Sequence, residues 1–188
     1  MIVWVLVATL CSGCSLVGVG RVSIGLTATT QGAVGLAVAG DVAAGVLHVP
    51  RAGAPSHGIG VTDGLYLGGG STAEGWELET GGRVDLVMLD ADSELRTGVR
   101  AGTLAREGRG PALAPELAFG LARASWWEPA AQRPRWGFEL RAGPLIGIEG
   151  GATLEAFRGY AGLTYQATAI SRRRDPIAAL IGRPQGKH

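Results

Sequence analysis

The side chains of this chain that could perform acid–base or nucleophilic chemistry are few. Glu77 and Glu79 are two residues apart, a spacing that places both carboxyl groups on one face of a strand, about 7 Å apart. Such a pair could act as a general acid and a general base, but alternation along several strands produces it without any catalytic role. Ser56 and His57 could belong to a hydrolase, although no acidic partner stands beside them. We therefore expect no catalytic residues.

Metal, cofactor and nucleic-acid sites also lack a sequence signal. The histidines His48, His57 and His188 do not have the spacing of metal ligands. The stretch GGGST at 68–72 lacks the lysine of a phosphate-binding loop. A formal net charge of +1 gives no field that would attract nucleic acid. We expect no metal, no cofactor and no nucleic-acid partner.

The composition predicts one domain that is unusually apolar. A chain of 188 residues is long enough for one domain with a proper interior. Only 18% of its residues are charged, compared with about 25% in typical soluble domains.

The N-terminal stretch MIVWVLVATLCSGC is typical of an export signal. Its apolar run is followed by small residues and is shorter than the roughly 20 residues of a membrane-spanning helix. Ser12-Gly13-Cys14 resembles the end of a bacterial lipobox, in which the cysteine is lipidated. We expect a signal peptide over 1–13 and lipidation at Cys14, with an ordinary cleaved signal and an uncleaved anchor as alternatives.

The charged and the apolar side chains alternate along the sequence with a period of two. In residues 76–90, Trp76, Leu78, Val84, Leu86 and Met88 fall on even positions, and Glu77, Glu79, Arg83 and Asp85 fall on odd ones. The same alternation recurs along the chain between turns rich in Gly, Pro, Asp and Ser. It predicts eight strands, over approximately 20–29, 33–48, 58–68, 74–90, 94–106, 113–127, 135–149 and 155–169.

The two faces of these strands can be assigned from energetics. Each Arg that faced lipid would cost about 2–4 kcal/mol near the bilayer midplane, so several would exceed the roughly 5–15 kcal/mol that stabilises a domain. A soluble barrel would have to enclose all the large apolar residues and expose mainly Ala and Gly. We therefore predict the apolar face outward, against lipid, and the charged face inward, where nearly equal numbers of acids and bases can pair.

This assignment gives two sets of site residues. The predicted interior ion network is Asp41, Glu77, Glu79, Arg83, Asp85, Arg96, Arg100, Glu116, Arg135, Glu139, Arg141, Glu149 and Arg158. The predicted lipid-facing set is Val34, Leu36, Val38, Trp76, Leu78, Leu86, Phe119, Trp136, Phe138, Leu140 and Ile146. Trp76, Trp126, Trp127 and Trp136 stand at predicted strand ends, as in the aromatic belts of membrane proteins.

The pattern over 20–170 resembles the small bacterial outer-membrane β-barrels of the eight-stranded, OmpA-like type. The resemblance implies an all-β, antiparallel, up-and-down membrane barrel with both chain ends on the periplasmic side. The chain departs from that type in its long loops PRAGAPSH and EPAAQRP on the expected periplasmic side, and in continuing beyond the last strand. Pro144 interrupts a predicted strand, and Asp63 falls on the apolar parity of another.

We therefore expect a signal peptide over 1–13, a short lead over 14–19, a barrel over 20–170 and a basic tail over 171–188. The expected function is that of an integral outer-membrane barrel with a structural, anchoring or interaction role. Its partners would be the lipid bilayer and a protein at loops such as 106–114, and its oligomeric state is not predicted. Two alternatives are a periplasmic lipoprotein with a calycin-like barrel or sandwich that binds a small apolar ligand, and a membrane lipid hydrolase.

Overall fold

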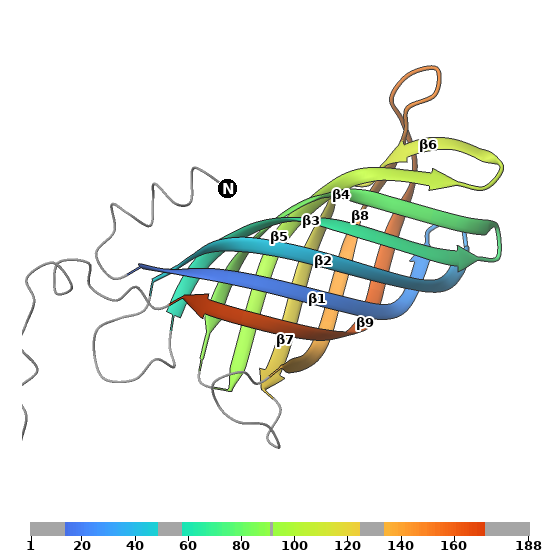
Figure 1. The fold of residues 1–188 in the computed structure, drawn as a ribbon. Helices are drawn as coiled ribbons and strands as arrows, with labels where there is room; N and C mark the ends of the chain where they lie inside the picture. The colour runs from blue at the N-terminus through green and yellow to red at the C-terminus, as the bar shows by residue number, and fades with distance from the viewer. Residues whose placement is uncertain (1–13, 49–57, 91, 125–133, 172–188) are drawn as a thin grey trace, which may run out of the picture.

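The computed structural model describes residues 14–48, 58–90, 92–124 and 134–171, which form strands and short turns (Figure 1). The strands are β1 Cys14–Thr29, β2 Val34–His48, β3 Gly58–Thr72, β4 Gly75–Leu89, β5 Ser93–Arg106, β6 Arg109–Leu113, β7 Glu116–Ala124, β8 Arg135–Gly147 and β9 Thr153–Ser171. The described residues include no helix long and apolar enough to cross a membrane.

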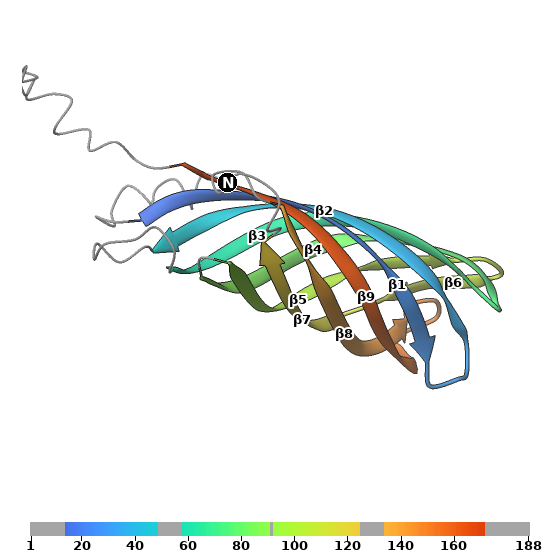
Figure 2. The ribbon, with the colours of Figure 1, turned by 90° about the horizontal axis from the view of Figure 1, so that it is seen from below.

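The strands form one sheet that closes on itself. All neighbours are antiparallel, β1 pairs with both β2 and β9, and β4 pairs with β5. β6 and β7 share one position in the ring, because each lies between β5 and β8. The ring therefore has eight positions, and its strands run up and down (Figures 1 and 2). This confirms the predicted all-β, eight-stranded, antiparallel barrel.

The register sets the tilt of the strands. A path of paired residues around the ring passes through Gly18, Ala44, Asp63, Val84, Val99, Leu117, Ala142 and Gly159, and returns to β1 at Ala28. The path thus closes ten residues further along β1. With ordinary strand spacings, this stagger corresponds to a tilt of about 40° from the barrel axis and to a narrow bore.

The sixth ring position is interrupted, where one strand over 113–127 was predicted. β6 ends at Leu113 and β7 begins at Glu116, with Ala114 and Pro115 between them. Proline has no N–H to donate to a ladder, so the pairing breaks at this point. Ala114 N donates instead to Gly102 O at 3.0 Å. Pro144, by contrast, stays within β8 in register with Phe157.

Several boundaries also differ from prediction. β1 begins at Cys14, so 14–19 belong to the strand and not to a lead. β3 continues through the glycine run to Thr72, where a turn was expected. Glycines fit here because the neighbouring strand is close: a Cβ on Gly70 would lie 2.5 Å from Leu36 O. The predicted signal peptide over 1–13 lies outside the described residues, as does the tail from 172 onward.

Two buried apolar clusters lie inside the barrel, one toward each end. The end that holds Cys14 and Ser171 is called the terminal end, and the opposite end, with the turns β1–β2, β3–β4, β5–β6 and β8–β9, is called the hairpin end. The cluster toward the terminal end is Val17, Val19, Leu47, Val87 and Leu89. The cluster toward the hairpin end is Leu104, Ala112, Ala114, Leu145 and Ala156.

Leu104 gives a test of this interior packing. Its side chain is 1% exposed, so we expect Leu104→Ala to lower the free energy of unfolding by about 2–5 kcal/mol through the cavity it leaves. Leu65→Ala is the matched control, because Leu65 is 70% exposed on the outer face. Urea unfolding followed by tryptophan fluorescence measures both, and an equal loss in the two variants would contradict the assignment of faces.

Candidate functional site

The interior of the barrel has one wall of small residues and an opposite wall of long charged ones. Ala37 and Ala39 of β2 and Gly68 and Gly70 of β3 line the small wall. The long side chains come from β4, β5, β7, β8 and β9, where alternation turns every second residue inward. The small wall therefore leaves room for guanidinium and carboxylate groups to meet across the bore.

One group of ion pairs lies in the middle of the barrel around Arg83. Its Nε lies 2.9 Å from Asp85 Oδ2 and its Nη2 donates to Asp85 Oδ1 at 3.0 Å, so the contact is bidentate. The same guanidinium lies 3.1 Å from Asp41 and 3.4 Å from Glu139. Arg21 of β1 binds the other side of these acids, at 2.7 Å from Asp41 and 2.9 Å from Asp85.

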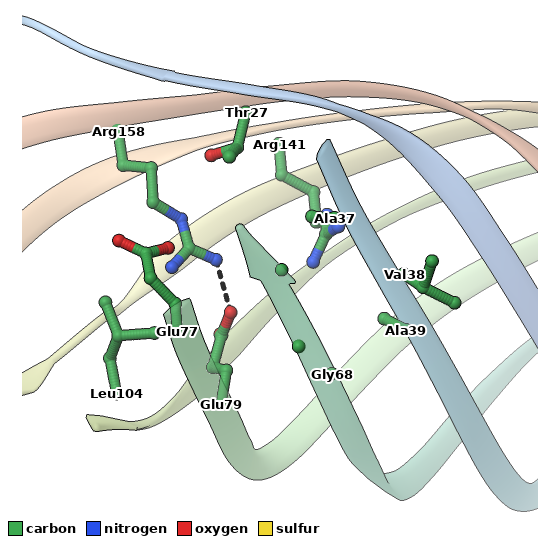
Figure 3. Close-up of a pocket in the computed structure, with 12 residues that line it drawn as sticks. Thr27, Ala37, Val38, Ala39, Gly68, Glu77, Glu79, Leu104, Arg141 and Arg158 are labelled. Atoms are coloured by element: carbon green, nitrogen blue, oxygen red, sulfur yellow. Dashed lines mark hydrogen bonds and ion pairs between the residues drawn. The ribbon is translucent and has the colours of Figure 1, made fainter. Parts of the chain in front are cut away.

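A second group lies nearer the hairpin end around Glu79 and Glu116. Arg100 is 2.8 Å from Glu79 and 3.2 Å from Glu116. Arg158 contacts the same two carboxylates, with 3.0 Å to Glu116. Figure 3 shows Arg158 reaching from β9 toward Glu79 on β4. Two arginines and two carboxylates thus form a closed square of alternating charge.

Arg141 joins the two groups into one network. Its guanidinium lies 3.3 Å from Glu139 of the first group and 3.9 Å from Glu116 of the second. Arg96 extends the first group toward the terminal end, with 3.8 Å to Glu139 and 3.2 Å to Glu94. Each arginine is buried and faces at least two carboxylates, so every enclosed cation has opposite charge beside it.

Two tyrosine side chains also contact the network. Tyr66 donates a hydrogen bond to Glu79 at 2.8 Å, and the Arg100 guanidinium lies 3.7 Å from the centre of the Tyr66 ring. Arg141 lies 3.6 Å from the centre of the Tyr160 ring. Both contacts have the geometry of cation–π interactions, which are strongest away from water.

The structure brings most of the predicted network together. Asp41, Glu79, Arg83, Asp85, Arg96, Arg100, Glu116, Glu139, Arg141 and Arg158 lie in the interior and form ion pairs. Arg135 lies at the margin, 4.0 Å from Glu94. Glu77 is half-buried and has no ion pair with a described residue. Glu149 was wrongly predicted: β8 ends at Gly147, so Glu149 is exposed in a turn.

Sequence reasoning missed several members of the network. Arg21 and Glu94 have the inward parity of β1 and β5, so the alternation rule could have found them. Tyr66, Tyr160 and Gln166 also point inward, and Gln166 donates to Glu94 at 2.5 Å. Their role depends on which charges lie beside them, and no local sequence signal gives that.

The network nearly fills the bore. A space beside Glu77, Glu79, Arg141 and Arg158 has a cavity volume of about 20 Å³. A volume of this size admits roughly one water molecule, and the charged side chains of the network around it are buried.

The carboxylates of Glu77 and Glu79 have different surroundings, because Glu77 is half-buried and Glu79 is buried. Glu79 is held by Arg100, Arg158 and Tyr66. No group of three potential metal ligands occurs within the described ranges. Ser56 and His57 lie outside those ranges.

The outer face carries the large apolar side chains. Val34, Leu36, Val38, Trp76, Leu78, Leu86, Phe119, Trp136, Phe138 and Leu140 are all exposed, and Ile146 is half-exposed beside the register shift of β8 and β9. Leu65 of β3 and Leu117 of β7, separated in the ring by β4 and β5, are 70% and 69% exposed. Contiguous apolar surface on this scale is rare on water-soluble monomers.

Exposed aromatic residues stand toward both ends of this outer face. Trp136 and Tyr165 pack edge to face with ring centres 4.6 Å apart, near the terminal ends of β8 and β9. Trp76 is exposed at the hairpin end of β4. Trp126 and Trp127 lie outside the described residues. Rings that flank an apolar surface on both sides are typical of membrane interfaces.

Comparisons with known proteins find likenesses only among solved structures. No protein-family model and no curated protein matches the chain. A designed transmembrane β-barrel matches with a TM-score of 0.42 and 17% identity, over 79% of this chain and 94% of that one. The crystal structure of Neisserial surface protein A (NspA) matches with a TM-score of 0.44 and 9% identity, over 83% of this chain and 99% of that one. At these values neither likeness identifies a function.

The buried network predicts a large effect of removing one charge. We expect Arg83→Leu to lower the free energy of unfolding by about 3–5 kcal/mol, because Asp41, Asp85 and Glu139 lose a shared buried cation. The control is Arg109→Leu, which removes an exposed pair with Glu74 at 3.0 Å and should cost about 0–1 kcal/mol. Urea titrations of both variants check this, and similar midpoints for the two would refute it.

Proposed function

We propose that the chain is an integral protein of the bacterial outer membrane, in which the barrel spans the bilayer and has a structural, anchoring or interaction role. The observation that carries the proposal is the inverted distribution of side chains: ion pairs inside and large apolar side chains outside, all around the ring. In water this arrangement would enclose the charges and expose the apolar surface. In a bilayer both faces meet the surroundings that they favour.

The strand lengths support this placement. A tilted strand needs about 9–11 residues to cross the hydrocarbon core. β1 has 16 residues, β2, β3 and β4 have 15 each, β5 has 14, β8 has 13 and β9 has 19. β6 and β7 together follow the full height of their neighbours. Each ring position is therefore long enough to cross the bilayer.

The filled interior favours a role for the outer surface and the turns. The charged side chains of the network are buried and paired with one another, and the space beside Glu77 and Glu79 has a volume of only about 20 Å³. A barrel of this kind holds its position by its apolar face and presents its turns to partners. The β5–β6 hairpin, which extends at the hairpin end (Figure 1), is the turn we propose as a contact surface.

The N-terminal signal and the lipidated cysteine belong to the same proposal. Cys14 is the first residue of β1 and pairs in register with His48 at the terminal end. Export and acylation would then deliver the chain to the membrane that its outer face requires.

The alternative of an apolar-ligand carrier has no support from the described interior. Such a carrier needs an apolar cavity, and the bore here contains a continuous network of arginines and carboxylates. The hydrolase alternative depends on Ser56 and His57, outside the described residues, and no observation favours it.

Extraction from membranes tests the proposal. We expect the full chain, expressed in a bacterial host, to remain in the membrane pellet after washing with alkaline carbonate and to migrate differently on gels before and after heating. The Cys14→Ser variant lacks the cysteine that would be lipidated, so it tests the barrel without a lipid tether. We expect it to remain in the pellet and to shift on heating in the same way. Release of the Cys14→Ser protein into the soluble fraction would overturn the proposal.

A further inference from the structure

Asp63 is a carboxylate on the apolar outer face of the barrel. It shares the outward parity of Val61, Leu65 and Leu67 in β3, and it is half-exposed. Its partners in register are Ala44 of β2 and Val84 of β4, which also face outward. Among the described strands, every other acidic residue at an internal strand position faces the interior or the rim of the hairpin end.

Asp63 has no partner within the described part of its own chain. No hydrogen bond or ion pair joins it to a described residue, because its cross-strand neighbours Ala44 and Val84 are apolar. An ionisable side chain within a membrane is costly and usually pairs with an opposite charge. If the barrel lies in a bilayer, a cation from outside the barrel would satisfy Asp63.

The chain itself carries a suitable cation at a comparable height. Arg123 is exposed at the terminal end of β7, on the outward parity of Leu117, Phe119 and Leu121. It has no ion pair with a described residue, whereas Arg109, the other described arginine at an outward strand position, pairs with Glu74 at the hairpin end. Asp63 lies in the terminal half of β3. A long arginine side chain can cover the remaining difference in height.

Asp63 and Arg123 cannot meet within one molecule. In the ring they are separated by β4 and β5, and both side chains point away from the axis. They can meet only when the β3 face of one copy lies against the β7 face of another.

The surfaces around the two charges have complementary relief. Beside Asp63, the row of paired residues continues through Ala44, Gly18 and Ala169, all of them small. A Cβ on Gly18 would have no neighbour within 4 Å, so this part of the outer face is low and open. Beside Arg123, Trp136 and Phe138 of β8 are exposed and project outward. Small residues let a neighbouring surface approach closely in a membrane.

We propose that the barrel associates laterally with further copies of itself, through a contact between the β2–β3 face that carries Asp63 and the β7–β8 face that carries Arg123. The two faces differ, so the contact is head to tail and builds a ring or a row of barrels. This inference rests on the proposed position in the membrane, since the pairing of Asp63 with Arg123 is strongest where lipid excludes water.

Charge reversal tests the contact directly. Donor- and acceptor-labelled copies are reconstituted in phosphatidylcholine vesicles at a fixed ratio of protein to lipid, and resonance energy transfer reports association. We expect transfer in the wild type, and about a tenfold weaker association in Asp63→Arg alone and in Arg123→Asp alone, because like charges then face each other. An equimolar mixture of the two variants should associate again, since each contact between unlike copies then joins opposite charges.

The controls separate this inference from the proposed function. Flotation with the vesicles and the gel shift on heating show in the same samples whether each variant is folded and inserted. Failure of the wild-type protein to insert would contradict the membrane proposal itself. Insertion without transfer in the wild type, or transfer unchanged by either reversal, would overturn the Asp63–Arg123 contact alone. Thr97→Arg, which adds a cation at an exposed outward position of β5, is the matched control and should leave transfer unchanged.

Discussion

The pairing of arginines with carboxylates inside the barrel is the constraint on which the rest of the structure depends. Charges enclosed by a closed sheet cannot be solvated by bulk water, so each must lie next to an opposite charge. In the network, each buried arginine lies beside carboxylates, and Arg141 connects the group around Arg83 to the group around Glu79. The small residues of β2 and β3 follow from the same need, because larger side chains would occupy the space that the guanidinium groups fill.

The outer face follows from the contents of the interior. Successive side chains of a strand point to opposite faces, so charged residues at the inward positions leave the outward positions for apolar residues. The composition of one face therefore constrains that of the other. The apolar clusters at the two ends enclose the charged middle and separate it from water at the rims. Asp63 and Arg123 depart from this division on the outside, which is why they carry the proposal of a contact between copies.

The sequence allowed the strands and the direction of their faces to be predicted, because a period of two persists along most of each strand. The bounds of the strands were predicted less accurately where glycine or proline interrupts the alternation. Gly68, Gly69 and Gly70 resemble a turn, yet they remain in β3 because the ladder requires only their backbone. Glu149 fits the parity of β8 but lies beyond its end. The partners of each charge were not predictable, because they depend on the stagger of the whole ring.

The seam between β1 and β9 joins the first described residues to the last. Leu16 pairs with Ser171 and Thr29 with Arg158, so this ladder connects the first described strand to the last one. Contacts of such long range slow folding, since a large loop must close before they form. Until β9 arrives, β1 and β8 are open edges able to pair with other chains. Pairing of β9 with β1 removes both edges, and the same step brings Arg158 beside Glu79 and Glu116.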